Sequence, residues 1–226
     1  GGEFLLTSDS GFERVASFRK FRLPGSASAV KEPRRTALGV LYEIMGNDVF
    51  GDPDSVPVRF FSRQELPILA RMLQNGIQSP WTSSVGRLFD AVASLSGLRQ
   101  KIRFEGQAAM EMEFAIGQEK AAGAYPFAVR NGTDSDPSAS ASMKSIDWEP
   151  TVRAILEDVR HGIPLATLAI KFHNTLVDII VDVAKRIGEK RIVLTGGCFQ
   201  NKYLMEHAVQ RLEQEFGFLV GNPEPR

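Results

Sequence analysis

Residues 192–201, IVLTGGCFQN, constrain the fold more than any other stretch of the sequence. The β-branched run predicts a strand, Gly196 and Gly197 predict a turn, and the residues from Gln200 onward predict a helix. Backbone N–H groups at a helix start, together with the helix dipole, suit an anion. Two glycines also let the backbone approach a phosphate without interference from a Cβ atom. The segment therefore predicts a turn that holds the phosphate end of a nucleotide-like ligand, with a purely geometric strand-to-helix turn as the alternative.

Asn201, Asp90 and Gly106 are further candidate binding residues. Asn201 lies about one turn into the predicted helix, where its amide can exchange hydrogen bonds with a ribose or a phosphate. Asp90 lies well off the apolar stripe of its own predicted helix, with Gly86 one turn earlier on the same flank, which leaves room for a ligand. A solvated surface Asp is the commoner interpretation of that pattern. Gly106 precedes a helix predicted over residues 105–122 and is a candidate for a second close approach of backbone to ligand.

Other polar residues are less informative. Glu111 and Glu113 point to different sides of a helix, so they form a poor acid–base pair and are predicted to be surface charges. The three histidines lack the spacing of metal-binding motifs, and His173 is predicted to be a hydrogen-bonded core residue. Cys198 is interpreted as a small buried turn residue rather than a nucleophile. These patterns assign no catalytic residue and no metal ligand.

Composition limits the kinds of partner. The 27 basic and 27 acidic residues balance, so no overall field points to nucleic acid or to an acidic membrane. A single cysteine excludes an internal disulfide and a multi-cysteine zinc site, which fits a reducing cytoplasm. The sequence shows no signal peptide and no apolar run that would span a bilayer. We therefore expect a cytoplasmic protein without a nucleic-acid or membrane partner.

The predicted elements divide the chain into two parts. Residues 1–150 are predicted to be helix-rich with short strands, and residues 151–226 to form an α/β part that carries the glycine turn. Strands are predicted over residues 3–7, 15–22, 125–130, 141–148, 191–195 and 216–220. Ser62 and Glu65 form a capping-box pattern before a helix. The GGEFLL start without a methionine and the strand-like FGFLV near the end predict a piece of a longer protein.

Seven stretches together resemble a known family. In chain order they are GGEFLL, FRLPG, KEPRRTALGVLYE, TSSVGRLFDAVASLSGL, FEGQAAMEMEFA, KFHNTLVD and VLTGGCFQNKYLME. They are similar to the HypF carbamoyltransferases, which mature [NiFe]-hydrogenases, from the first residue to about Val220. The combination is far more specific than the glycine turn alone.

The resemblance is to the last, large domain of that multidomain family, which is related to the tRNA threonylcarbamoyl transferases. It implies an α/β fold of the actin/Hsp70-like ATPase class, with two lobes around a nucleotide cleft. Residues 1–226 would form the C-terminal part of the carbamoyltransferase domain, mainly one lobe with a helical insertion. In the family, an upstream domain makes carbamoyl-adenylate from carbamoyl phosphate and ATP. The last domain passes the carbamoyl group to the C-terminal cysteine of a HypE-type partner, and dehydration then yields a cyanide ligand for the hydrogenase iron.

The resemblance also implies site residues and ligands. An FD motif of the related transferases, whose Asp contacts the adenylate ribose, matches Phe89 and Asp90, and a downstream glycine matches Gly106 more loosely. Their TGG…N segment matches Thr195, Gly196, Gly197 and Asn201. The implied ligand is ATP or carbamoyl-adenylate.

The family further implies a divalent metal, held by histidines of an HxxxH-type motif and by an Asp of an NDGG-like segment. Neither motif occurs in this sequence. We therefore expect the isolated chain to fold without transferring carbamoyl groups, and turnover in an activity assay would contradict this. A non-catalytic module of the same fold, which binds nucleotide or docks a partner, is the alternative. A sugar kinase of the same superfamily is disfavoured because the family motifs are so continuous.

Overall fold

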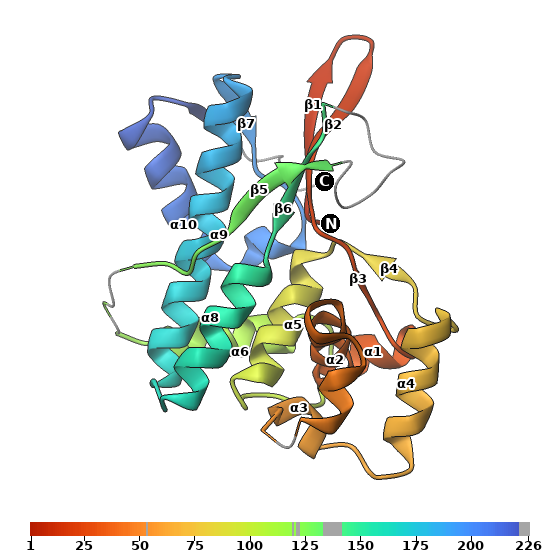
Figure 1. Cartoon of the computed structure of the whole chain (residues 1–226). Helices are drawn as coiled ribbons and strands as arrows, with labels where there is room; N and C mark the ends of the chain where they lie inside the picture. Colours follow the sequence, from red (N-terminus) through yellow and green to blue (C-terminus); the bar gives the residue numbers. More distant parts are fainter. Residues whose placement is uncertain (53, 119, 121–122, 133–141, 222–226) are drawn as a thin grey trace.

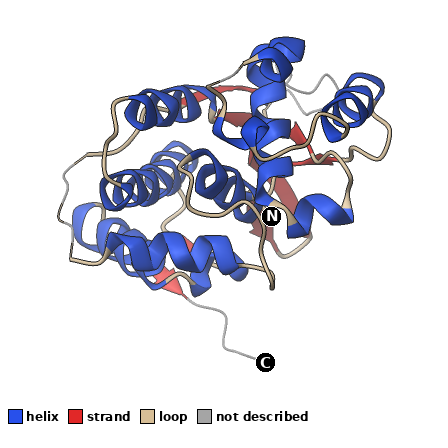
Figure 2. Ribbon diagram, turned by 90° about the horizontal axis from the view of Figure 1, so that it is seen from below, coloured by secondary structure: helices blue, strands red, loops and turns tan. Residues whose placement is uncertain are grey.

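The computed structural model describes residues 1–52, 54–118, 120, 123–132 and 142–221. They form a mixed α/β structure in which the helices lie below and beside a twisted sheet, and the N-terminal hairpin of that sheet projects from the molecule (Figures 1 and 2). The described strands of the main sheet follow the order β1–β2–β6–β5. Their bounds are β1 (Glu3–Ser8), β2 (Gly11–Phe18), β5 (Ala128–Asn131) and β6 (Lys144–Asp147).

Two antiparallel hairpins meet in the main sheet through a parallel pair. β1 pairs with β2 and β5 pairs with β6, while Ala16 to Phe18 of β2 run parallel to Lys144 to Ile146 of β6. The strands predicted over residues 125–130 and 141–148 are thus observed as the shorter pair β5 and β6, whereas β1 extends one residue beyond its predicted range of 3–7. Residue 141 of the predicted strand and most of the polar stretch before it lie outside the described residues.

The strand predicted over residues 15–22 is wrong as one continuous element. The backbone N–H of Arg19 donates to the Ile146 carbonyl oxygen at 2.9 Å, and the chain then leaves the main sheet. It continues as β3 (Phe21–Arg22), which pairs with β4 (Trp81–Thr82). The buried ring of Phe21 meets Trp148 edge to face at 5.8 Å, so apolar packing draws the chain away from β6.

Helices dominate the rest of the first part. They are α1 (Ala27–Lys31), α2 (Pro33–Met45), α3 (Val56–Arg59), α4 (Glu65–Asn75), α5 (Val85–Leu95) and α6 (Gln107–Ile116), with a 3-10 turn, η1 (Gly46–Gly51). The predicted capping box is confirmed: Glu65 N–H donates to Ser62 Oγ at 3.2 Å, and Ser62 N–H donates to Glu65 Oε2 at 2.8 Å. The helix predicted over residues 105–122 ends earlier, because Gly117 has a φ of 54° that breaks it.

The second part alternates helices and strands as predicted. Its elements are α8 (Glu149–Arg160), α9 (Leu165–Ile187), β7 (Arg191–Val193), the 3-10 turn η2 (Gly197–Gln200), α10 (Lys202–Gln210), the π-helical turn η3 (Arg211–Glu215) and β8 (Leu219–Gly221). β7 and β8 pair in parallel, and α9 and α10 pack side by side (Figure 1). β8 begins later than predicted because the N–H groups of Gly217 and Phe218 still bond back to Glu213 and Leu212.

Helix α5 lies at the centre of the helical layer, where α2, α6 and α8 pack around it (Figure 1). All of its residues except Gly86 are buried. Phe89 of α5 meets Phe172 of α9 edge to face at 5.1 Å, so one apolar cluster joins the two parts of the chain. No helix among the described residues has both the length and the apolarity that a bilayer crossing requires.

Candidate functional site

The candidate binding residues from the sequence come together at one end of α5. A Cβ atom built on Gly86 of α5 would lie 4.0 Å from the sulfur of Cys198 in η2. From the next residue of α5, Arg87 Nη2 reaches Glu105 Oε1 at 3.3 Å, and Glu105 directly precedes Gly106. Three segments that are far apart in the sequence therefore meet here: the first turns of α5, the start of α6 and the chain that follows β7.

Asp90 is buried and incompletely paired. Its exposed fraction is 1%, and its Oδ2 atom lies 2.7 Å from Arg87 Nη1. The geometry of that contact is not a well-directed hydrogen bond, so Oδ2 has no hydrogen-bond partner among the described residues. Burial raises the pKa of Asp90 to about 7. The positive charge of Arg87 lowers this pKa, and the negative charge of Glu105 raises it further. This oxygen has a free lone pair but is itself buried, so a hydroxyl that donates to it would have to enter between the side chains that cover it.

The interpretation of Asp90 as a solvated surface residue is wrong. An apolar stripe predicts one buried face, but α5 is covered on nearly every side by neighbouring helices. Gly86 does lie on the same side as Asp90, where it leaves room for Cys198. Arg87, three residues before Asp90, is the sequence signal for their pairing, because side chains at this spacing are neighbours on a helix.

The glycine turn is open to solvent. Thr195, Gly196 and Gly197 are exposed, and no described atom lies within 4 Å of a Cβ built on either glycine. Gly196 has a φ of 104°, a conformation that favours glycine. The helix predicted from Gln200 onward is observed as α10, which begins two residues later at Lys202, after the 3-10 turn η2. The tight 3-10 turn forms because Phe199 N–H and Asn201 N–H donate to the carbonyl oxygens of Gly196 and Cys198.

Asn201 caps α10 and contacts α9. Its Oδ1 accepts a hydrogen bond from Leu204 N–H at 2.8 Å, and its Nδ2 lies 2.9 Å from Nε2 of His173. The prediction that His173 is a hydrogen-bonded core residue is confirmed, since its ring is fully buried and Nδ1 donates to the Ala169 carbonyl oxygen at 2.7 Å. Burial lowers the pKa of His173 to about 4. The sequence does not reveal the bond to Asn201, because the two residues are 28 positions apart.

Gly106 lies at the N-cap of α6. It has a φ of 84°, is exposed, and has no described atom within 4 Å of a built Cβ.

The two glutamates of α6 are half-buried and bonded, so their prediction as surface charges is wrong. Glu111 accepts two hydrogen bonds from Arg99, each at 2.7 Å. Glu113 accepts one from Tyr203 N–H at 3.1 Å and so fastens α6 to the first turn of α10.

The thiol of Cys198 is half-buried, and this burial raises its pKa, which makes it a poorer nucleophile. Among the described residues, no three His, Cys, Asp or Glu side chains lie close enough together to hold a metal ion.

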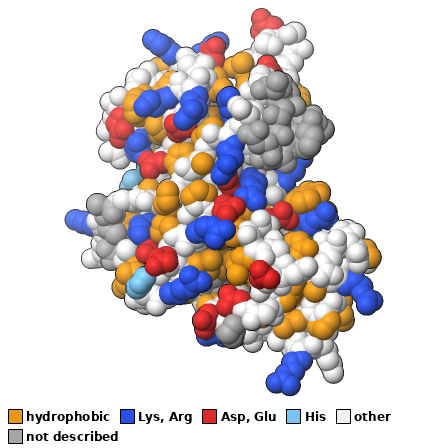
Figure 3. Space-filling model, in the orientation of Figure 1, with side chains coloured by type: hydrophobic (Ala, Val, Ile, Leu, Met, Phe, Trp, Pro, Cys, Tyr) orange, Lys and Arg blue, Asp and Glu red, His pale blue; other side chains and the backbone are white. Residues whose placement is uncertain are grey.

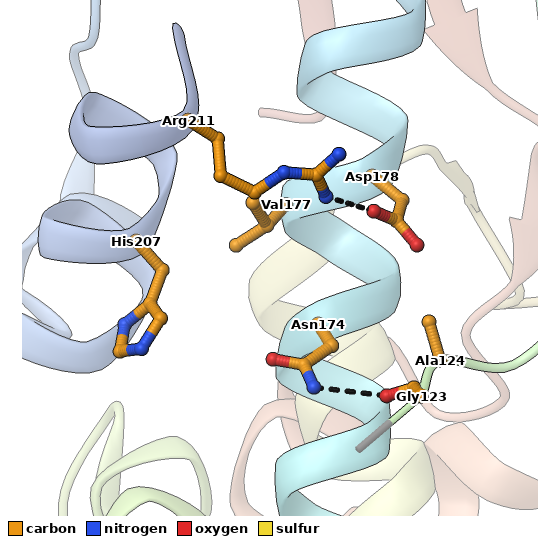
Figure 4. A pocket seen from close by; sticks show the side chains of 7 residues that line it. All are labelled: Gly123, Ala124, Asn174, Val177, Asp178, His207 and Arg211. Atoms are coloured by element: carbon orange, nitrogen blue, oxygen red, sulfur yellow. Dashed lines mark hydrogen bonds and ion pairs between the residues drawn. The ribbon is translucent and has the colours of Figure 1, made fainter. Parts of the chain in front are cut away.

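A separate cavity of about 270 Å³ lies between α9 and α10 (Figure 4). Its lining residues are Gly123, Ala124, Asn174, Val177, Asp178, His207 and Arg211. The charged groups in it pair with each other, Arg211 with Asp178, and Asn174 donates to the Gly123 carbonyl oxygen at 2.8 Å. None of the candidate binding residues predicted from the sequence lines this cavity.

Basic and acidic side chains are interspersed over the face seen in Figure 3, so that face carries no strong field of one sign.

Known proteins resemble this chain over almost its whole length. Residues 1–224 match the family model described as "Carbamoyltransferase, Kae1-like Domain, second subdomain". The Carbamoyltransferase HypF of Synechocystis sp. is 34% identical, covering 95% of this chain and 28% of its own length. The Probable carbamoyltransferase HypF of Methanocaldococcus jannaschii is 27% identical, covering 100% of this chain and 28% of its own length.

Solved structures give the same relationship. A full-length HypF in a phosphate- and nucleotide-bound form superposes with a TM-score of 0.83 at 33% identity, over 98% of this chain and 33% of that chain. The HypF of T. kodakarensis superposes with a TM-score of 0.71 at 24% identity, over 93% of this chain and 27% of that chain, and supports the fold alone. The chain thus spans about 28% of the length of the curated relatives named above.

Proposed function

This chain belongs to the HypF carbamoyltransferase family, and on that premise we propose that it contributes an adenylate-binding surface to a carbamoyltransferase. The observation that carries the proposal is the meeting of three features at the end of α5. These are the buried Asp90 oxygen without a hydrogen-bond partner among the described residues, the exposed glycine turn, and the open glycine at the start of α6. The related full-length HypF, solved with phosphate and nucleotide, supports a nucleotide as the ligand.

Each feature suits a different part of an adenylate. Asp90 would accept hydrogen bonds from the ribose hydroxyls, which supply the donor that its Oδ2 lacks. The backbone at Gly196 and Gly197 would lie against the phosphate, since neither residue has a side chain to keep the ligand away. Gly106 would let the ligand approach the start of α6 in the same way. The proposed ligand is ATP or carbamoyl-adenylate.

The proposed reaction is transfer of the carbamoyl group to the C-terminal cysteine of a HypE-type partner, as a step of [NiFe]-hydrogenase maturation. The cysteine thiolate attacks the carbamoyl carbon, a carbon–sulfur bond forms, and AMP leaves with the electrons of the broken carbon–oxygen bond. The residues of this chain would hold the adenylate so that this carbon faces the thiolate. The proposal also includes the actin/Hsp70-like two-lobed fold, a cytoplasmic location and a divalent metal in the longer protein. Among the described residues, no group of three His, Cys, Asp or Glu side chains could hold that metal, so its ligands would come from elsewhere in the longer protein.

Calorimetric titration of AMP and ATP into the chain tests the nucleotide site. Wild-type protein is expected to bind, and Asp90→Asn to bind about tenfold more weakly, because a neutral amide accepts a hydroxyl hydrogen bond less strongly than a carboxylate. Asn201→Ala is expected to weaken binding as well. Asp182→Asn is the matched control, since Asp182 is a partly exposed carboxylate that pairs with Arg186 one turn later in α9. Absence of nucleotide binding by the wild type, together with tight binding of a HypE-type protein, would instead identify a docking module.

A further inference from the structure

His173 occupies the point where three helices of the candidate site meet. Its ring lies in α9, fully buried, with the Phe89 ring centroid at 5.2 Å and the Tyr203 ring centroid at 5.5 Å, both edge to face. Phe89 directly precedes Asp90 in α5, and Tyr203 lies two residues after Asn201 in α10. The imidazole therefore fills the space between the two elements that carry candidate binding residues.

The hydrogen bonds of the ring have fixed directions. The Ala169 carbonyl oxygen can only accept, so Nδ1 carries the proton, and Nε2 is left with a lone pair. That lone pair accepts from Asn201 Nδ2 at 2.9 Å. A protonated ring would place an N–H group against the amide N–H of Asn201, and the burial that lowers the pKa of His173 to about 4 prevents this near neutral pH.

The amide of Asn201 is fixed from both ends. Nδ2 donates to His173, while Oδ1 accepts from Leu204 N–H at 2.8 Å. An amide side chain has two donor hydrogens and two acceptor lone pairs, so one of each is left for another partner. Without His173, the cap alone would hold Oδ1, and the amide nitrogen would lose its fixed direction.

We propose that His173 is a positioning residue that sets the orientation of the Asn201 amide beside the glycine turn, and that it joins this amide to the Phe89–Asp90 turn of α5. The inference deepens the proposed function and rests on it for the identity of the ligand. His173 itself does not touch the ligand and acts through Asn201.

Two substitutions separate the hydrogen bond from the packing. His173→Phe keeps an aromatic ring between Phe89 and Tyr203 but offers no acceptor to Asn201. His173→Gln places an amide oxygen at about the reach of Nε2 and can accept the same bond. His207→Phe is the matched control, because His207 also bonds a carbonyl oxygen four residues earlier in its helix and also contacts Tyr203, but it has no bond to Asn201.

Calorimetric titration with AMP gives the first readout. His173→Phe is expected to weaken AMP binding about tenfold, while His173→Gln and His207→Phe stay within about threefold of the wild type. A purely structural role would not be rescued by Gln, which packs less well than Phe against the two rings. AMP binding by His173→Phe at wild-type affinity would overturn the proposal. If the Phe variant does not fold, His173→Leu, which also lacks an acceptor, replaces it.

The side-chain amide signals of Asn201 in a nitrogen–proton NMR spectrum give a second readout that needs no nucleotide. In His173→Phe they are expected to move toward the position of a free amide, and in His173→Gln to remain near the wild-type position. Unchanged signals in His173→Phe would overturn the inference whether or not AMP binds. Failure of the wild type to bind AMP, with the expected NMR shifts, would reject the proposed ligand and leave the His173–Asn201 coupling established.

Discussion

Replacing Asp90 by Asn removes a charge that the fold buries almost completely. Burial raises the pKa of the carboxyl from its usual 3.8 to about 7, even though Arg87 lies 2.7 Å away. Because the folded-state pKa is the higher one, the folded protein keeps a proton that the unfolded chain releases. The stability of the wild type is therefore expected to fall as the pH rises between about 4 and about 7, and then to level off.

The size of the effect follows from that difference in pKa. One unit of pKa shift corresponds to about 1.36 kcal/mol. Linkage between a pKa of about 7 in the folded protein and 3.8 in the unfolded chain then costs the wild type on the order of 2–3 kcal/mol between about pH 5 and about pH 8. Asn does not titrate, so the free energy of unfolding of Asp90→Asn should gain on the order of 2–3 kcal/mol relative to the wild type over the same range, or about 5–10 °C in Tm.

Urea unfolding of the wild type and of Asp90→Asn at about pH 5 and about pH 8 measures this double difference. All other titrating groups are common to the two proteins, so they largely cancel in the comparison. Asp182→Asn, which changes the same functional group in its ion pair with Arg186, reports the general effect of such a substitution. If Asp90→Asn and the wild type respond to pH identically, the carboxyl is not desolvated and the argument from burial is refuted.

Further predictions concern glycines and a helix cap. Gly39→Ala should destabilise the fold by about 1–3 kcal/mol in urea unfolding, because a Cβ there would lie 1.9 Å from the Arg22 carbonyl oxygen; stabilisation by the better helix former would contradict this packing. Ser62→Ala should cost about 1 kcal/mol of unfolding free energy through loss of its capping bond with Glu65, and an unchanged urea midpoint would argue against the cap. Gly197→Ala should leave the urea midpoint unchanged, since its Cβ would meet no described atom within 4 Å, but weaken AMP binding about tenfold by intruding on the ligand. Equal AMP affinity would show that the ligand does not approach that glycine.

Local chemistry in the sequence predicts local structure well. The capping box before α4 forms as predicted because both of its hydrogen bonds lie within four residues of chain. The alternation of helix and strand after residue 151 predicts the α/β arrangement of that part, and β7 and β8 indeed pair in parallel across a helical crossover, which favours parallel strands. The break after Arg19 could not be predicted from the local pattern, because it depends on a carbonyl group of Ile146 and on the ring of Trp148.

In the candidate site, too, features set by local sequence could be predicted, and features set by packing between distant segments could not. The glycine turn is recognisable from the sequence because a backbone with positive φ strongly favours glycine, as at Gly196. The burial of Asp90 left no such mark, since an apolar stripe describes one face of a helix and α5 is covered on nearly all sides. The bond between His173 and Asn201 is set by the way α9 packs against α10, and only the three-dimensional arrangement brings these two residues together.

The electrostatics of Asp90 connect stability with the proposed function. A buried carboxylate oxygen without a hydrogen-bond donor lowers the stability of the ligand-free fold, and Arg87 offsets only part of that penalty, because the pKa remains raised. A hydroxyl that donates to this oxygen would favour the ionised form and lower the pKa again. By linkage, such a ligand must bind more tightly as the pH rises through about 7. Comparing adenosine affinities at about pH 6 and about pH 8 isolates this effect, because adenosine has no phosphate that titrates there. An affinity that does not rise with pH in the wild type would separate the buried charge of Asp90 from ligand binding.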